Sequence, residues 1–137
     1  MSKPDPRVTA ATTPVQGRFI VDARTNHFVA DATLPRGGTA EAPGAAELFL
    51  SGILVCALGV MTDTARARAI DPHITAEASY TQDPQDRTRF AHVYFAFTVA
   101  GVSQAIAEEL VQAFKDVCPL YNTVARTAPV TVTANVR

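Results

Sequence analysis

The chain of 137 residues has no tryptophan, only two cysteines and no run of charge of one sign. Its 12 basic and 13 acidic residues leave a net charge of −1 and are scattered, so no basic stripe can follow a phosphate backbone. Nucleic acid is therefore not an expected partner. Two cysteines are too few for a disulfide-stapled scaffold, and a chain of this length can bury a core without one.

Segments typical of export or membrane insertion are also missing from the sequence. The first seven residues lack the apolar core of a signal peptide, and the longest apolar run, Leu48 to Met61, is shorter than the roughly 20 residues that cross a bilayer. We expect a soluble, cytoplasmic protein without a membrane partner. The three histidines show no ligand spacing to either cysteine, so neither a metal nor a cofactor is expected.

Apolar periodicity and turn residues predict an α+β fold. A loose leader over residues 1–14 is followed by a single domain over residues 15–137. The predicted strands cover residues 16–21, 26–31, 74–80, 90–99 and 130–136. Ser103 is expected to cap a second, amphipathic helix. Because the strands arrive in hairpins rather than alternating with helices, antiparallel sheets are favoured.

A first helix is predicted from about residue 45 to residue 69. Its segment from Glu47 to Met61 is apolar on nearly every face, which is typical of a helix buried on all sides. A chain of this length has little other material to cover such a helix, so we expect a second copy of the chain to supply the cover. Cys56 lies in this helix and should be shielded from bulk water.

Cys118 follows the second helix, and Pro119 forces the chain to change direction at the sulfur. Either cysteine could have a purely structural role: a buried thiol is commonly an inert core residue, and a cysteine before proline can simply end a helix. In a reducing compartment, however, two thiols that work together are more typical of redox chemistry or metal binding than of a structural bridge.

Reduction of a peroxide is one reaction that uses two thiols. One thiolate attacks a peroxide oxygen, and the second thiol rescues the resulting sulfenic acid before it over-oxidises. Because burial raises the pKa of a thiol, the attacking group needs a nearby cation, and arginine stays charged. Arg18 and Arg24, in or beside the first hairpin, are the candidates, and the sequence does not choose between them.

Two segments together resemble one protein family. The segment AELFLSGILVC, ending at Cys56, and the segment CPLYN, beginning at Cys118, are similar to the OsmC/Ohr family of osmotically inducible and organic hydroperoxide resistance proteins. Asp31, the Gly37-Gly38 pair and Pro43 fit the same pattern, and the resemblance covers roughly residues 18–136.

The resemblance implies an intertwined homodimer in which antiparallel sheets surround a long buried helix. It implies a thiol peroxidase active in stress response, in which Cys56 attacks an organic hydroperoxide and Cys118 resolves the sulfenic acid through a disulfide. The reductant would be a lipoylated protein or another dithiol.

The chain departs from the hydroperoxide reductases of this family at one position. Those members carry a glutamate ten residues before the first cysteine, whereas this chain has Ala46 there and Glu47 next to it. At 100° per residue, Glu47 lies about 180° from Cys56 around the helix, so it points away from the sulfur. Glu47 is therefore either a substitute catalytic group or a favourable charge in the first turn. The alternatives to a peroxidase are a non-enzymatic small-molecule binding protein and a redox sensor.

Overall fold

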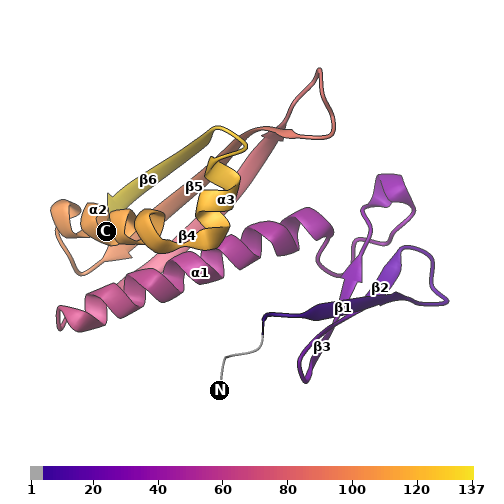
Figure 1. Ribbon diagram of the computed structural model, residues 1–137, viewed down its shortest axis with the longest axis horizontal. Helices are drawn as coiled ribbons and strands as arrows, with labels where there is room; N and C mark the ends of the chain where they lie inside the picture. The colour runs from indigo at the N-terminus through magenta and orange to yellow at the C-terminus, as the bar shows by residue number, and fades with distance from the viewer. Residues whose placement is uncertain (1–4) are drawn as a thin grey trace. The chain divides into compact units, whose positions relative to one another are not determined.

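The computed structural model describes residues 5–137, whose elements are shown in Figure 1. In chain order they are β1 (Val8–Thr12), β2 (Arg18–Ala23), β3 (Asn26–Asp31), a 3-10 turn η1 (Leu34–Arg36), α1 (Ala45–Ala67), β4 (His73–Gln82), β5 (Phe90–Ala100), α2 (Gln104–Val117), α3 (Pro119–Ala125) and β6 (Val130–Val136). The chain forms two compact units, one up to Phe49 and one from Leu50 onward, and α1 begins in the first and continues in the second.

The N-terminal unit holds a three-stranded antiparallel sheet in the order β1-β2-β3. The predicted hairpin is present, with Arg18 opposite Asp31 and Ala23 opposite Asn26. The strand β1 lies inside the segment that the sequence suggested was a loose leader. It pairs with β2 along its whole length although every one of its residues is exposed.

The C-terminal unit holds a second sheet in the order β4-β5-β6. The strands β4 and β5 form the predicted antiparallel hairpin, with Ala78 opposite Phe95. The prediction of antiparallel pairing is wrong for β6, which runs parallel to β5 with Val132 opposite Phe95. The physical reason is the long connection through α2 and α3, which carries the chain back to the end of the sheet where β5 began.

The core of the C-terminal unit lies between one face of this sheet and the helices. The inward residues of β5 are fully buried and alternate along the strand as predicted: Val93, Phe95, Phe97 and Val99. Phe114 of α2 packs edge-on against Phe97, with ring centroids 5.6 Å apart. Ser103 caps α2 as predicted, because its side chain accepts a hydrogen bond from the Ile106 N–H.

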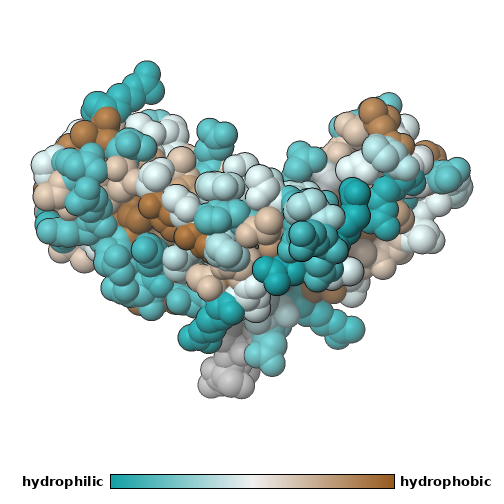
Figure 2. Space-filling view, turned by 90° about the horizontal axis from the view of Figure 1, so that it is seen from above, coloured by the Kyte–Doolittle hydropathy of each residue, from teal (hydrophilic) through white to brown (hydrophobic). Residues whose placement is uncertain are grey.

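The helix α1 presents only one stripe of its surface to this core. The buried residues recur every three or four positions and are Leu50, Ile53, Ala57, Met61 and Ala65. Burial on all sides is therefore not found within the single chain: Val55 is 70% exposed. Apolar side chains also reach the surface elsewhere, and Figure 2 shows them scattered among hydrophilic ones. The apolar faces that prompted the expectation of a partner subunit are present and uncovered in one chain.

The length of α1 bears on the expectation that nothing here spans a membrane. At 23 residues and a mean hydropathy of 1.9 over its most apolar window, α1 is long and apolar enough to cross a bilayer by those two criteria alone. A helix that packs into the core of a water-soluble domain meets the same criteria, and α1 contributes its stripe to the core of the C-terminal unit. The length and composition of α1 are therefore the same as those expected for a membrane span and for a core helix.

Candidate functional site

The two cysteines meet in the C-terminal unit although 62 positions separate them in the chain. Cys56 projects from the middle of α1, and Cys118 stands at the junction where α2 ends and α3 begins. The Cys118 thiol donates a hydrogen bond to the Cys56 sulfur over 2.7 Å, and both cysteines are free thiols. Cys118 is fully buried and Cys56 is partly exposed, so only Cys56 can be reached from outside in the single chain.

Burial sets the protonation state of Cys56. Loss of solvent is the main cause of the shift, and the neighbouring Cys118 adds to it; together they raise the pKa of the Cys56 thiol to about 11. A thiol with this pKa is almost entirely protonated at neutral pH, and the neutral form is a poor nucleophile. The pair is therefore well placed to form a disulfide, but it needs a further group to ionise Cys56.

The junction between α2 and α3 fixes the position of Cys118. Its backbone is extended (φ −76°, ψ 115°), which breaks the helical path between the two helices. Its N–H still donates to the Phe114 carbonyl of α2, and its sulfur accepts a hydrogen bond from the Tyr121 N–H of α3 over 3.4 Å. The cysteine therefore ends one helix and caps the next. The helix α3 was not predicted, because a seven-residue helix that begins at a proline is too short to display a recognisable helical repeat of apolar residues.

Arg18 is held in a carboxylate cluster in the N-terminal unit. Its Nε donates to Asp31 Oδ1 over 2.9 Å, and its Nη2 donates to Asp31 Oδ2 and to the Glu41 carboxylate over 3.2 and 3.0 Å. These bonds, followed by the attraction of the two charges, raise the pKa of Arg18 further above its ordinary value. Two carboxylates, those of Asp31 and Glu41, therefore fix the orientation of the Arg18 guanidinium.

Asp31 is the centre of this cluster, and its carboxylate is fully buried. The Arg18 guanidinium, helped by the Thr39 hydroxyl and the Ala42 N–H, holds the pKa of Asp31 well below its usual range, although burial alone would raise it. The N–H of Glu41 also donates to the same carboxylate, over 3.0 Å. A single carboxylate therefore joins the hairpin to the loop that leads into α1.

Gly38 allows this loop to lie close against the hairpin. A Cβ at this position would stand 1.8 Å from the Ala32 carbonyl oxygen, a distance at which no side chain fits. The backbone of Gly38 also passes Gly17 closely, and the Ala32 N–H donates to the Gly17 carbonyl over 2.7 Å. Close backbone packing is thus the reason why Thr39, Glu41 and Ala42 reach Asp31.

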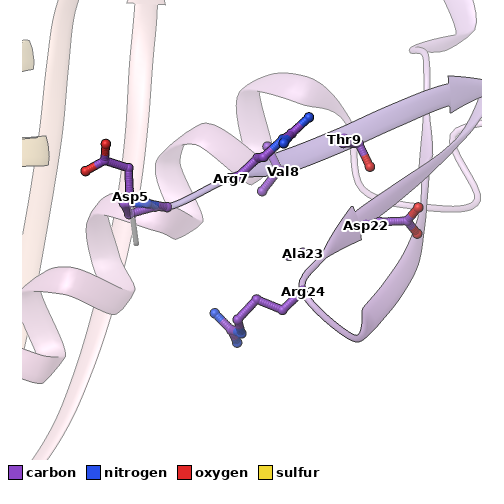
Figure 3. A pocket seen from close by; sticks show the side chains of 8 residues that line it. Asp5, Arg7, Val8, Thr9, Asp22, Ala23 and Arg24 are labelled. Carbon is purple, nitrogen blue, oxygen red and sulfur yellow. The ribbon is translucent and has the colours of Figure 1, made fainter. Parts of the chain in front are cut away.

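Arg24, the other candidate, is placed differently. It occupies the turn between β2 and β3 in a left-handed conformation (φ 59°), and it lines an open hollow of about 700 Å³ together with Arg7, Thr9 and Asp22. Figure 3 shows the side chains of Arg24 and Asp22 leaving the chain in opposite directions. The side chains of Arg24 and Asp22 therefore do not converge in this hollow (Figure 3), and within residues 5–137 no hydrogen bond clamps Arg24 to a carboxylate as Asp31 clamps Arg18.

Glu47 occupies the first turn of α1. Its Oε1 accepts a hydrogen bond from the Gly44 N–H over 3.3 Å, which satisfies one of the donors left open at the start of a helix. Glu47 thus has a structural task at this end of the helix. Within residues 5–137, no group of three or more His, Cys, Asp or Glu side chains is placed to hold a metal ion.

The sequence patterns gave no signal for Glu41, and they indicated Asp31 only through the family resemblance. The hairpin contained a usable signal: when its turn is placed correctly, Arg18 and Asp31 stand directly opposite each other, as charge pairs on neighbouring strands do. The contribution of Glu41 depends on the loop path and has no periodic signature.

Comparison with known proteins places the chain in a family. The profile of the OsmC-like protein family matches residues 38–133, and the chain belongs to this family. No curated protein matches it by sequence. Among solved structures, it is similar to the OsmC-like protein of Mycoplasma pneumoniae, with a TM-score of 0.75, 19% identity and coverage of 98% of this chain and 99% of that one.

Two further structures are similar at the same level. One is an organic hydroperoxide resistance protein from Elizabethkingia anophelis, with a TM-score of 0.76, 18% identity and coverage of 99% of both chains. The other is an organic hydroperoxide resistance protein of Bacillus subtilis, with a TM-score of 0.67, 20% identity and coverage of 96% and 97%. At these identities the likeness shows the OsmC-like α+β fold, which confirms the resemblance seen in the sequence.

The lowered pKa of Asp31 leads to a prediction about stability. The folded state favours the ionised carboxylate, so its contribution is complete above the ordinary pKa of about 4 and is lost as the pH falls through the lower folded value. Asp31→Asn should therefore lower the urea midpoint at pH 7, and its difference from wild type should shrink in strong acid. Glu41→Gln, which alters the exposed partner of the same arginine, should have a smaller effect. Equal effects of the two substitutions at pH 7 would contradict a central role for Asp31.

Proposed function

We propose that the protein is a thiol peroxidase that reduces organic hydroperoxides. The observation that carries this proposal is the contact between two free thiols distant in sequence, one partly exposed and one fully buried, 2.7 Å apart. Membership of the OsmC-like family and similarity to structures named organic hydroperoxide resistance proteins support the substrate class. The partial exposure of Cys56 supports its role as the attacking thiol, and the burial of Cys118 supports a resolving role.

The proposed reaction needs both sulfurs and one external reductant. The Cys56 thiolate attacks the outer oxygen of ROOH, the O–O bond breaks, and RO⁻ takes up a proton to leave as the alcohol while Cys56 becomes a sulfenic acid. The Cys118 thiol then attacks that sulfur, forming the disulfide and releasing water. A dithiol, free or carried on a lipoylated protein, reduces the disulfide and is itself oxidised to a disulfide.

The division of roles between the thiols is open to direct test. With cumene hydroperoxide, the wild type should form the Cys56–Cys118 disulfide, Cys118→Ser should accumulate a dimedone-reactive sulfenate on Cys56, and Cys56→Ser should not oxidise rapidly. Mass spectrometry of quenched samples distinguishes the three products. Equal peroxide sensitivity of the two single variants would reject the assignment, and a wild type that does not turn over with a dithiol would favour a binding protein or a redox sensor.

Activation of Cys56 is the step that most needs support, because its pKa of about 11 in the single chain leaves few thiolates at neutral pH. We propose that an arginine of the first hairpin lowers this pKa in the working protein. The clamp formed by Asp31 and Glu41 favours Arg18, whose orientation is fixed, over Arg24 in its exposed turn. The bond of Glu47 at the start of α1 favours a structural role for this residue over a catalytic one.

Replacing the activating arginine by methionine should therefore slow the enzyme. Arg18→Met should raise the Cys56 pKa by a unit or more, measured as the pH dependence of alkylation in a Cys118→Ser background. It should also slow peroxide reaction at least tenfold at pH 7. Arg24→Met should have less effect, and Arg36→Met, an exposed arginine of the same unit, should have none. If neither Arg18→Met nor Arg24→Met changes the pKa and the rate, arginine-assisted attack is excluded and the binding-protein alternative gains.

We also propose that the protein works as a cytoplasmic homodimer, since the exposed apolar face of α1 around Val55 needs cover. Light scattering should give the dimer mass at low micromolar protein. Val55→Asp should shift the mass toward the monomer, because it places a charge on that face, whereas Gln112→Asp on the polar side of α2 should not. A folded wild-type monomer under these conditions would remove the argument from the uncovered helix.

A further inference from the structure

The turn that carries Cys118 has a donor missing from its backbone. In a continuous helix the N–H of residue 119 would donate to the carbonyl of Lys115, one turn earlier. Residue 119 is proline, which has no N–H, so the Lys115 carbonyl loses this partner where α2 gives way to α3. Another hydrogen-bond donor must therefore satisfy the Lys115 carbonyl oxygen. A donor from α3 would link α2 to α3 next to the Cys118 sulfur.

The side chain of Asn122 supplies the missing donor. Its Nδ2 donates to the Lys115 carbonyl over 2.9 Å and to the Cys118 carbonyl over 2.8 Å. An amide NH₂ group has two hydrogens, so both are used, one for each side of the bend. The backbone N–H of Asn122 also donates to the Cys118 carbonyl, over 3.0 Å. One residue of α3 therefore holds the last turn of α2 and the cysteine itself.

These bonds fix the backbone from which the Cys118 sulfur projects. The sulfur is also tied to the Tyr121 N–H on the same helix, and it contacts Cys56 on α1. If the Lys115 carbonyl were released, α3 would lose its hydrogen bond to the last turn of α2. The angle between the helices would then be limited by Pro119 and by the packing of Phe114 against Tyr121, whose ring centroids are 5.0 Å apart, and the sulfur would move with that angle. Disulfide closure is sensitive to such movement, because the Cys118 sulfur must approach the Cys56 sulfur along the line of the bond that breaks to the leaving group.

We infer that Asn122 is a positioning residue for the resolving thiol: it replaces the N–H that Pro119 lacks and so keeps Cys118 in reach of Cys56. The inference deepens the proposed function and rests on it for the peroxide step alone. The hydrogen bonds of Asn122 go to backbone carbonyls and not to the sulfurs, so its loss should leave attack on peroxide by Cys56 unchanged. It should slow the closure of the disulfide and make the disulfide less favourable at equilibrium.

The first test needs no peroxide. The purified protein is equilibrated with oxidised and reduced glutathione, and the ratio of Cys56–Cys118 disulfide to dithiol is measured after acid quenching. Asn122→Ala should lower the equilibrium constant for the disulfide at least tenfold. Asn122→Ser should do nearly the same, because a hydroxyl can bond the Cys118 carbonyl four residues back but does not reach Lys115. Thr123→Ala, which removes a hydroxyl bonded only to Pro119 within α3, is the control and should match wild type.

A second test follows the peroxide reaction in the same variants. After one equivalent of cumene hydroperoxide with dimedone present, Asn122→Ala and Asn122→Ser should consume peroxide at the wild-type rate but divert at least ten times more Cys56 into the dimedone adduct. A change confined to overall stability would not alter this partition. If Asn122→Ala does not fold, the serine variant, which keeps one of the two bonds, carries both tests.

The outcomes separate this inference from the proposed function. Glutathione equilibria within twofold of Thr123→Ala for the folded Asn122 variants would overturn the positioning role. A wild type that closes its disulfide with glutathione yet does not react with hydroperoxide would end the peroxidase proposal. In that case the glutathione equilibria would still decide whether Asn122 positions the sulfur.

Discussion

Contact between two sulfurs inside the C-terminal core is the interaction on which the chemistry of this protein depends. Withdrawal from water makes Cys56 hard to ionise, and the neighbouring Cys118 adds to that difficulty. The same contact means that little conformational change is needed to bring the Cys118 sulfur to the Cys56 sulfur, because the two are already 2.7 Å apart. For the thiol peroxidase cycle that we propose, this arrangement favours closure of the disulfide and leaves ionisation of Cys56 to a nearby cation.

The arginine cluster of the N-terminal unit fixes the orientation of Arg18 by means of carboxylates. A buried carboxylate, Asp31, accepts from the guanidinium and from the loop that leads into α1, so the orientation of Arg18 is built into the hairpin and its neighbouring loop. The cluster belongs to the N-terminal unit, and the two thiols belong to the C-terminal unit.

The sequence predicted most of the fold because periodicity and caps are local signals. The alternation in β5, the cap at Ser103 and the change of chain direction at Pro119 each depend on a few neighbouring residues. The direction of β6 was mispredicted, since parallel pairing follows from the path of a long crossover and not from the strand itself. The sequence contexts of the two cysteines drew attention to both thiols. The Glu41 carboxylate reaches Arg18 only because of the loop path, and the Asn122 side chain bonds a backbone carbonyl, so no residue pattern displays either contact.

The 62 positions between the cysteines also connect redox state to chain entropy. A bond between them would close a loop of that length and restrict the unfolded chain, which in the loop-closure model favours the native state by about 4 kcal/mol. Because Cys118 lies on the crossover between β5 and β6, the same bond would tie that crossover to α1. The disulfide form would then be harder to unfold than the dithiol form, so the two redox forms would differ in lifetime as well as in chemistry.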